Sequence, residues 1–118
     1  MSAVEQYARA HIVTDTADTA EDEHQVVPVA LSYDPDADPR QVHMTLPGPH
    51  EWAFPRELLE RGLRGPVESG DVRVWPCGRV QAVVEFHSAH GVSVVQFDSK
   101  VLIRFLRRTY TAVTPVAH

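Results

Sequence analysis

Residues 51–76, EWAFPRELLERGLRGPVESGDVRVWP, decide the fold, because they contain a strand, a short helix and a second strand in that order. Pro55 suits the first turn of a helix, where a missing N–H group costs nothing, and Glu57 lies near the positive end of the helix dipole. Gly62 and Gly65 are expected to end the helix after about two turns. A helix this short is stabilised by packing, so the sequence predicts a connector between strands 51–54 and 71–75.

Three further strands are expected before this block. Apolar and polar residues alternate through residues 4–14, 25–33 and 41–46, which is typical of strands with one buried face. The alanines in residues 4–14 also allow a helix there. Pro28 removes a ladder donor, so it indicates an edge position or a bulge. The polar, acidic residues 16–23 are expected to form a solvated loop, and the proline-rich residues 34–39 a turn.

Two strands and a helix are expected after the block. Residues 79–87 place Val80, Ala82, Val84 and Phe86 on one face, and a hairpin leads into residues 92–97. Asp98 or Ser99 can cap a final helix with one apolar face. Residues 111–118 show no periodicity and are predicted to be disordered. The sequence therefore predicts a single α+β domain with about seven strands, a short helix after the fourth and a longer helix at the C-terminus.

The amino-acid composition excludes several classes of function. The chain has 118 residues, 43% hydrophobic residues and a formal net charge of −5, which indicates a folded domain without general attraction to phosphate backbones or anionic lipids. Its single cysteine, Cys77, cannot form an intramolecular disulfide, and no apolar stretch is long enough to span a bilayer. We expect a cytoplasmic protein.

Catalytic and metal-binding patterns are weak. His87 with His90, and His43 with His50, have spacings that could hold an ion, but no further ligands lie nearby in sequence to complete a site. Cys77 has no surrounding hydrolase signature, and the chain contains no glycine-rich phosphate loop. The sequence predicts no enzyme, no metal site and no cofactor.

Two groups of residues are candidates for protein binding. Asp71, Arg73 and Trp75 share one face of a predicted strand, and a tryptophan beside an arginine is a common interface anchor. The alternative is that Trp75 packs under the last helix. The second group, on the predicted C-terminal helix, consists of Arg104, Arg107 and Arg108. These arginines could recognise acidic segments or phosphate, or form a solvated helix face.

With Tyr110 and the strand aromatics, the same arginines could bind single-stranded nucleic acid, which the negative net charge makes less favourable.

Several stretches of the chain closely resemble the SsgA-like proteins of sporulating actinomycetes. The main ones are residues 51–63 and GDVRVWP at residues 70–76, supported by LSYD at 31–34 and VLIRFLRRT at 101–109. Residues 28–109 carry the resemblance, while residues 1–25 match only loosely. The GDVRVWP block is the most specific of these matches.

The resemblance implies a Whirly-like fold of two antiparallel sheets, with one helix after the fourth strand and another at the end. It also implies a non-enzymatic role in septum formation and sporulation, at division septa. Implied partners are division proteins, such as the tubulin-like protein FtsZ or an SsgA-like paralogue, and further copies of the chain, including trimers. Compared with longer relatives, the sequence ends without an extended C-terminal segment, so a contact made by that segment is expected to be missing.

Overall fold

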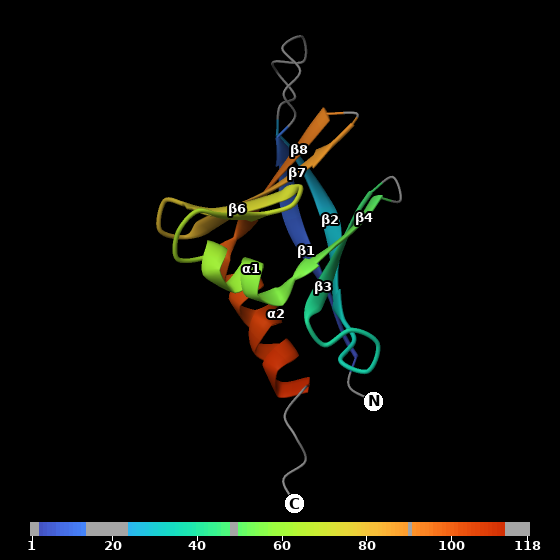
Figure 1. Ribbon diagram of the computed structural model, residues 1–118. Helices are drawn as coiled ribbons and strands as arrows, with labels where there is room; N and C mark the ends of the chain where they lie inside the picture. Colours follow the sequence, from blue (N-terminus) through green and yellow to red (C-terminus); the bar gives the residue numbers. More distant parts are fainter. Residues whose placement is uncertain (1–2, 14–23, 48–49, 90, 113–118) are drawn as a thin grey trace, which may run out of the picture.

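The computed structural model describes residues 3–13, 24–47, 50–89 and 91–112. Within these residues it contains eight strands and two helices, arranged as in Figure 1. They are β1 (Val4–Val13), β2 (His24–Tyr33), β3 (Gln41–Leu46), β4 (His50–Pro55), α1 (Arg56–Gly62), β5 (Val67–Ser69), β6 (Val72–Cys77), β7 (Gln81–Ser88), β8 (Gly91–Asp98) and α2 (Ser99–Ala112). The predicted order of strands and helices is confirmed, with β5 as an addition.

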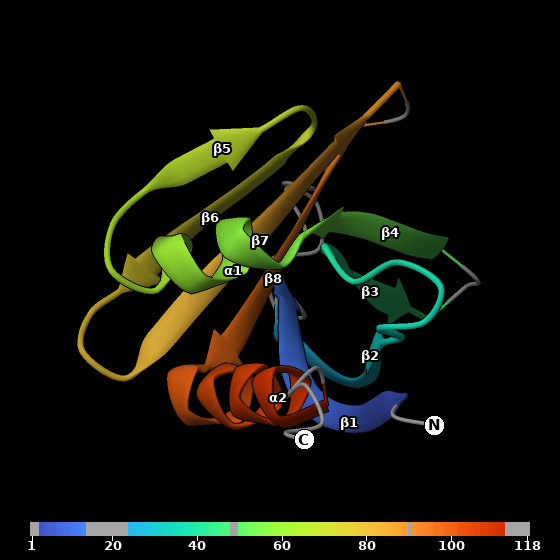
Figure 2. The same ribbon diagram turned by 60° about the horizontal axis from the view of Figure 1, so that its bottom comes forward.

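All eight strands belong to one antiparallel sheet in the order β4-β3-β2-β1-β8-β7-β6-β5. The expectation of two sheets with about seven strands is therefore corrected. β1 pairs with β2 over ten residues but with β8 over only three, from His11 opposite Gln96 to Val13 opposite Val94. This narrow connection lets the two halves of the sheet turn toward each other into a nearly closed shape (Figure 2).

The inner face of the bent sheet is apolar. In β3 the side chains alternate between half-buried and buried positions, with Val42, Met44 and Leu46 buried. Phe86 of β7 stacks on Trp52 of β4, with ring centroids 4.7 Å apart. These two strands are not hydrogen-bonded to each other, so the stacking joins the halves across the interior.

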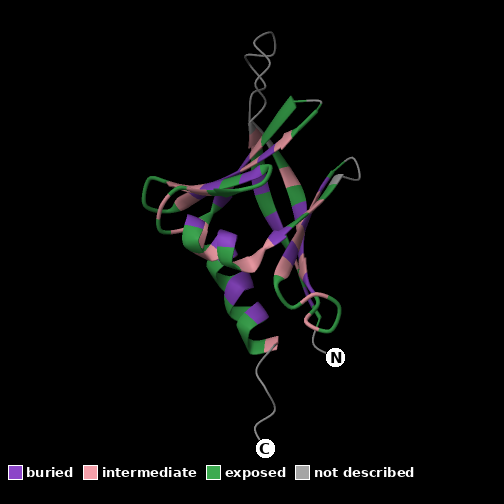
Figure 3. Ribbon diagram, viewed as in Figure 1, coloured by how far each residue is buried: buried purple, intermediate pink, exposed green. Residues whose placement is uncertain are grey.

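Both helices cover the inner face, as the buried positions in Figure 3 show. α1 buries Leu58, Leu59 and Gly62 and contacts β4, β5 and β6. α2 buries Leu102, Phe105, Leu106 and Thr109 and contacts β1, β7 and β8. Figure 2 shows α2 lying beside β1. The other face of the sheet, which we call the outer face, points away from both helices.

Several boundaries differ from the sequence prediction. Pro55 precedes α1 as its N-cap residue, and Val80 lies exposed in the turn before β7 instead of in the strand. Pro28 lies in an interior strand, but the part of β2 around it extends beyond the pairs with β3, so the position is locally an edge. α2 continues through Ala112, which is two residues into the tail that the sequence predicted to be disordered. The rest of that tail, residues 113–118, and the predicted acidic loop, residues 16–23, lie outside the described residues.

A test of this packing uses Gly62, where α1 lies directly on β6. A Cβ atom at Gly62 would lie 2.2 Å from Cγ1 of Val74. We expect Gly62→Ala to destabilise the fold by about 1–3 kcal/mol, because α1 must move away from the sheet. Urea unfolding measures the change. Gly65→Ala is the control, since nothing lies within 4 Å of a Cβ atom there; equal stability of both variants would contradict the contact.

Candidate protein-binding surfaces

The first candidate surface, around Trp75, lies on the outer face of the sheet. Val72 and Val74 are buried toward α1, so Arg73 and Trp75 point the other way. Trp75 is half-buried and lies opposite Val83 of β7. The alternative in which Trp75 packs under α2 is wrong, because α2 covers the inner face.

Arg73 holds one side of the Trp75 ring. Its guanidinium carbon lies 5.4 Å from the ring centroid, a cation–π arrangement. The same guanidinium forms ion pairs with Glu68 at 3.4 Å and Glu85 at 3.5 Å, and Glu85 also contacts His87 Nε2 at 2.8 Å. Exposed ion pairs of this kind contribute little stability, but together they limit how far Arg73 can move. The contacts of Arg73 therefore help to fix the position of the Trp75 ring on β6.

Asp71 lies in the turn before β6 and is exposed. Its carbonyl oxygen accepts a hydrogen bond from the His87 amide at 2.8 Å, which ties this turn to β7. The structure therefore brings all three residues of the first candidate group to one region of the sheet, as the alternation in the sequence indicated.

The second candidate surface is the exposed side of α2. Arg104, Arg107 and Arg108 are all exposed and, with Ala3, Val4, Thr111 and Ala112, line a cavity of about 460 Å³. Arg108 is also structural: its guanidinium donates to the Glu5 carbonyl oxygen at 3.3 Å and to Gln6 Oε1 at 3.1 Å. The guanidinium groups of Arg104 and Arg107 form no hydrogen bond or ion pair with another described residue, although the Arg107 carbonyl oxygen accepts a hydrogen bond from Thr111 Oγ1 at 3.0 Å.

The two candidate surfaces do not form one patch. Trp75 is on the outer face of β6, whereas α2 packs on the inner face against β1, β7 and β8. A single compact ligand therefore does not touch both surfaces. They can serve two different partners.

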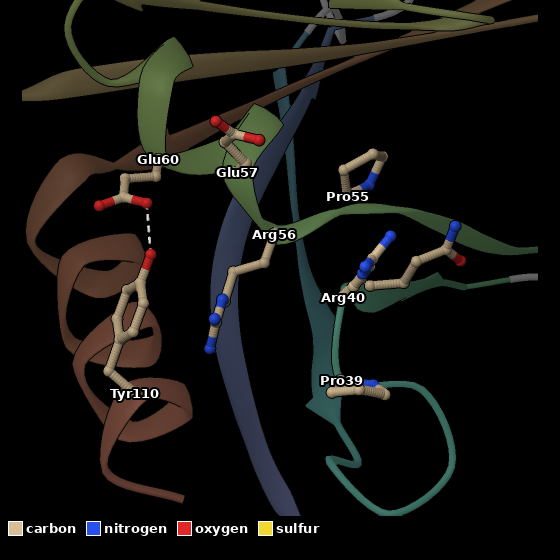
Figure 4. A pocket seen from close by; sticks show the side chains of 8 residues that line it. Pro39, Arg40, Pro55, Arg56, Glu57, Glu60 and Tyr110 are labelled. Carbon is tan, nitrogen blue, oxygen red and sulfur yellow. Dashed lines mark hydrogen bonds between the residues drawn. The ribbon is translucent and has the colours of Figure 1, made fainter. Parts of the chain in front are cut away.

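A third feature, which sequence reasoning missed, is a clamp formed by Arg56 between α1 and α2 (Figure 4). The Arg56 guanidinium carbon lies 4.0 Å from the ring centroid of Tyr110 and 5.2 Å from that of Tyr33. Its NH1 group donates to the Tyr33 hydroxyl at 3.4 Å and to Thr109 Oγ1 at 3.5 Å. Arg56 thus ties β2, the start of α1 and the end of α2 together.

A cavity of about 560 Å³ lies beside this clamp, lined by Pro39, Arg40, Gln41, Pro55, Arg56, Glu57, Glu60 and Tyr110. In Figure 4 Arg56 extends toward Tyr110, while Arg40 extends from the opposite wall. The two guanidinium groups do not converge on one point, and Glu57 and Glu60 balance their charge. The cavity therefore does not present a concentrated anion site.

The histidines predicted as weak metal candidates have other partners. His43 contacts Glu51 at 2.9 Å and His87 contacts Glu85 at 2.8 Å. The side chains of His50 and His90 lie outside the described residues. Among the residues that are described, no group of three metal-ligating side chains lies together. Cys77 is exposed at the end of β6.

The sequence was compared with the models of known protein families. Residues 27–117 match the family model of the Streptomyces sporulation and cell division protein, SsgA. The chain belongs to the SsgA family. The match begins within β2 and ends beyond α2, so it includes Trp75, the arginines of α2 and the residues of the Arg56 clamp.

Curated members of the SsgA family are similar to this chain over much of its length. The sporulation-specific cell division protein SsgB of Streptomyces coelicolor is 41% identical over 96 residues, covering 75% of this chain and 69% of the relative. SsgB of Salinispora tropica is 40% identical, covering 74% of this chain and 66% of the relative. The chain thus spans about two thirds of the length of these relatives.

Solved structures of SsgA-family proteins have the same fold. One comes from work on SsgB mutations that correlate to longitudinal cell division during sporulation of Streptomyces coelicolor; it has a TM-score of 0.79 at 32% identity and covers 96% of this chain and 90% of its own. An SsgA-like sporulation-specific cell division protein from Thermobifida fusca has a TM-score of 0.79 at 25% identity, covering 94% and 82%. Within the described residues, no helix of this SsgA-family chain is both long and apolar enough to cross a membrane.

The Arg56 clamp includes Tyr110, whose ionisation makes the stability of the fold depend on pH. The Tyr110 hydroxyl donates to the Glu60 carboxylate, which, with partial burial, raises the pKa of Tyr110 above 10.0 although Arg56 opposes the shift. The contribution of Tyr110 to stability is therefore complete below about pH 10 and lost as pH rises through the higher folded-state pKa. We expect Tyr110→Phe to cost about 0.5–1 kcal/mol at neutral pH and progressively less above about pH 10.

Urea unfolding across this pH range measures the difference between Tyr110→Phe and the unsubstituted protein. Tyr7→Phe is the control, since Tyr7 is 71% exposed on the outer face. A difference between the Tyr110 variant and the parent that stays constant above about pH 10 would rule out the Glu60 contact as its cause.

Proposed function

We propose that this chain is a non-catalytic cell-division protein that binds other proteins to promote or position septum formation. The role in cell division is supported by membership of the SsgA family, whose curated relatives are sporulation-specific cell division proteins. The observation that carries the binding role is Trp75, which is half-buried on the sheet face that neither helix covers and is contacted by Arg73. Such a tryptophan is the kind of residue that anchors a partner.

The proposal includes the cytoplasm, at division septa, as the place of action, and residues 1–118 as one SsgA-like domain. Its partners are division proteins, with FtsZ or an SsgA-like paralogue as the first to test, and further copies of the chain. Two surfaces on opposite faces of the sheet suit two kinds of partner, because each remains accessible when the other is occupied.

The polar side chains at the cavity beside the Arg56 clamp are arranged for packing and not for catalysis, which agrees with a binding role. Around the cavity beside the Arg56 clamp, Arg40 and Arg56 extend from opposite walls, and the Glu60 carboxylate accepts a hydrogen bond from Tyr110. Catalysis by an acid and a base would need side chains that converge on one reacting atom. The arrangement at this cavity stabilises the packing of α2 instead.

Single-stranded nucleic-acid binding, the function suggested by a Whirly-like arrangement, has less support. Arg73 beside Trp75 is neutralised by Glu68 and Glu85, so the tryptophan lacks the basic surroundings that a phosphate backbone requires. A fluorescence titration with labelled oligonucleotides distinguishes the two functions. Steep, salt-dependent binding would favour nucleic acid over the protein-binding role.

Trp75→Ser tests the protein-binding role. We expect it to weaken binding of the chain to its division partner by about tenfold or more, because truncating an interface anchor typically costs about 2 kcal/mol. Interferometry with immobilised chain and purified FtsZ, or with a purified SsgA-like paralogue, gives the dissociation constants.

Val80→Ser is the matched control for Trp75→Ser, since Val80 is 62% exposed in the turn that follows β6. Thermal unfolding shows that both variants remain folded. If Trp75→Ser and Val80→Ser bind the partner as tightly as the parent protein does, the outer face is not the contact surface.

A further inference from the structure

The cavity between α2 and the start of β1, which we call the α2 groove, has a distinctive lining. Its lining includes the small apolar residues Ala3, Val4 and Ala112 together with Arg104 and Arg107. Its volume is about 460 Å³. A ligand that fits here combines small side chains, for the apolar part of the lining, with negative charge, for the arginines.

Among the residues that the structure describes, no carboxylate balances the positive charge at the α2 groove. The α2 sequence, SKVLIRFLRRTYTA, contains four basic residues and no acidic residue, although the whole chain has a net charge of −5. Arg104 lies three and four positions before Arg107 and Arg108, so these like charges are neighbours on the helix and repel one another. Among the described residues, no carboxylate forms an ion pair with Arg104 or Arg107.

The chain itself contains a segment of the required chemistry. Residues 14–23, TDTADTAEDE, have five carboxylates and no basic residue, and the other five residues are threonine or alanine. Carboxylates pair well with guanidinium groups, and alanine and threonine are small enough to contact the apolar part of the lining. This acidic segment and the α2 groove are complementary in charge and in side-chain size.

The acidic segment cannot reach the α2 groove of its own molecule. It connects Val13 to His24, which are paired at the far end of β1 and β2. Val4, at the groove, lies nine residues from Val13 along β1, about 30 Å at 3.3 Å per residue. A ten-residue connection anchored at both ends extends at most about 18 Å from them. A second molecule must therefore supply the segment.

We propose that the α2 groove binds the acidic segment 14–23 of a second copy of this chain. Arg104 and Arg107 pair with its carboxylates, while Arg108 continues to hold β1. The proposal rests on the proposed function only in taking α2 as a contact surface, and it assigns that surface to self-association. The outer face around Trp75 then remains available for division proteins.

The contact joins two different regions of the two copies, because a groove at one end of β1 receives a segment from the other end. Two copies can exchange their segments reciprocally about a two-fold axis, or each contact can lead to a further copy, in which case the assembly closes into a ring or extends as a filament. Since the contact is ionic and exposed, it weakens as salt rises.

Analytical ultracentrifugation of the full chain tests the proposal. We expect self-association that strengthens with protein concentration and weakens by about tenfold or more between about 50 and 500 mM salt. Arg104→Glu with Arg107→Glu, and separately Asp18→Lys with Glu21→Lys and Asp22→Lys, which makes the segment net positive, should each weaken it by about tenfold or more.

Mixing the two charge-reversed proteins gives the decisive result. Each carries one reversed region and one original region, so the acidic groove of one variant attracts the basic segment of the other, and the original groove attracts the original segment. We expect the mixture to associate although neither variant does so alone. A structural role for the arginines predicts no such recovery.

Arg61→Glu with Arg64→Glu is the control, because both arginines are exposed at the end of α1, away from the groove. It should associate as the parent protein does, and thermal unfolding should show all variants folded. The proposal is overturned by a parent protein that stays monomeric at low salt, by reversed variants that associate normally, or by a mixture that fails to associate. Binding of FtsZ through Trp75 is measured separately and is unaffected by these outcomes.

Discussion

The stacking of Phe86 on Trp52, with Phe54 at 6.0 Å from the same ring, is the interaction on which the rest of the structure depends. Backbone hydrogen bonds join the two halves of the sheet at only three residue pairs between β1 and β8. Without an apolar contact across the interior, so narrow a connection would leave the halves free to splay. The aromatic contact brings β4 and β7 face to face, which creates the enclosed inner surface that α1 and α2 cover. It also determines that the other surface, with Trp75, stays open to solvent.

Local structure could be predicted from the sequence because it depends on neighbouring residues. The alternation in residues 41–46 gave the exact bounds of β3, and Asp98 caps α2 by accepting a hydrogen bond from the Lys100 amide at 3.0 Å. The joining of the strands into one sheet could not be predicted, because it depends on pairs such as Ile12 with Val95, which are far apart in the chain. Val80 was misassigned because an exposed valine in a turn continues the apolar pattern of the strand that follows.

The candidate surfaces, like the strands, could be predicted only as far as neighbouring residues determine them. Alternation along β6 correctly placed Arg73 with Trp75 and opposite Val74, but only the position of the helices shows which of the two faces is open. The Arg56 clamp was not foreseen, since its partners Tyr33, Thr109 and Tyr110 come from three separate parts of the fold. For the same reason the sequence could not show that Arg108 braces β1 while Arg104 and Arg107 remain available.

The sheet ends in two edge strands, β4 and β5, and neither offers a good template for another chain to extend it. β5 is three residues long, and β4 is six residues long and ends in a proline, which lacks an amide proton for a ladder bond. Growth of the sheet from molecule to molecule, the usual route to irreversible aggregation, is therefore disfavoured at both ends. Copies that associate through side chains, as proposed for the α2 groove, could be separated by salt or by competing partners, whereas a shared sheet could not.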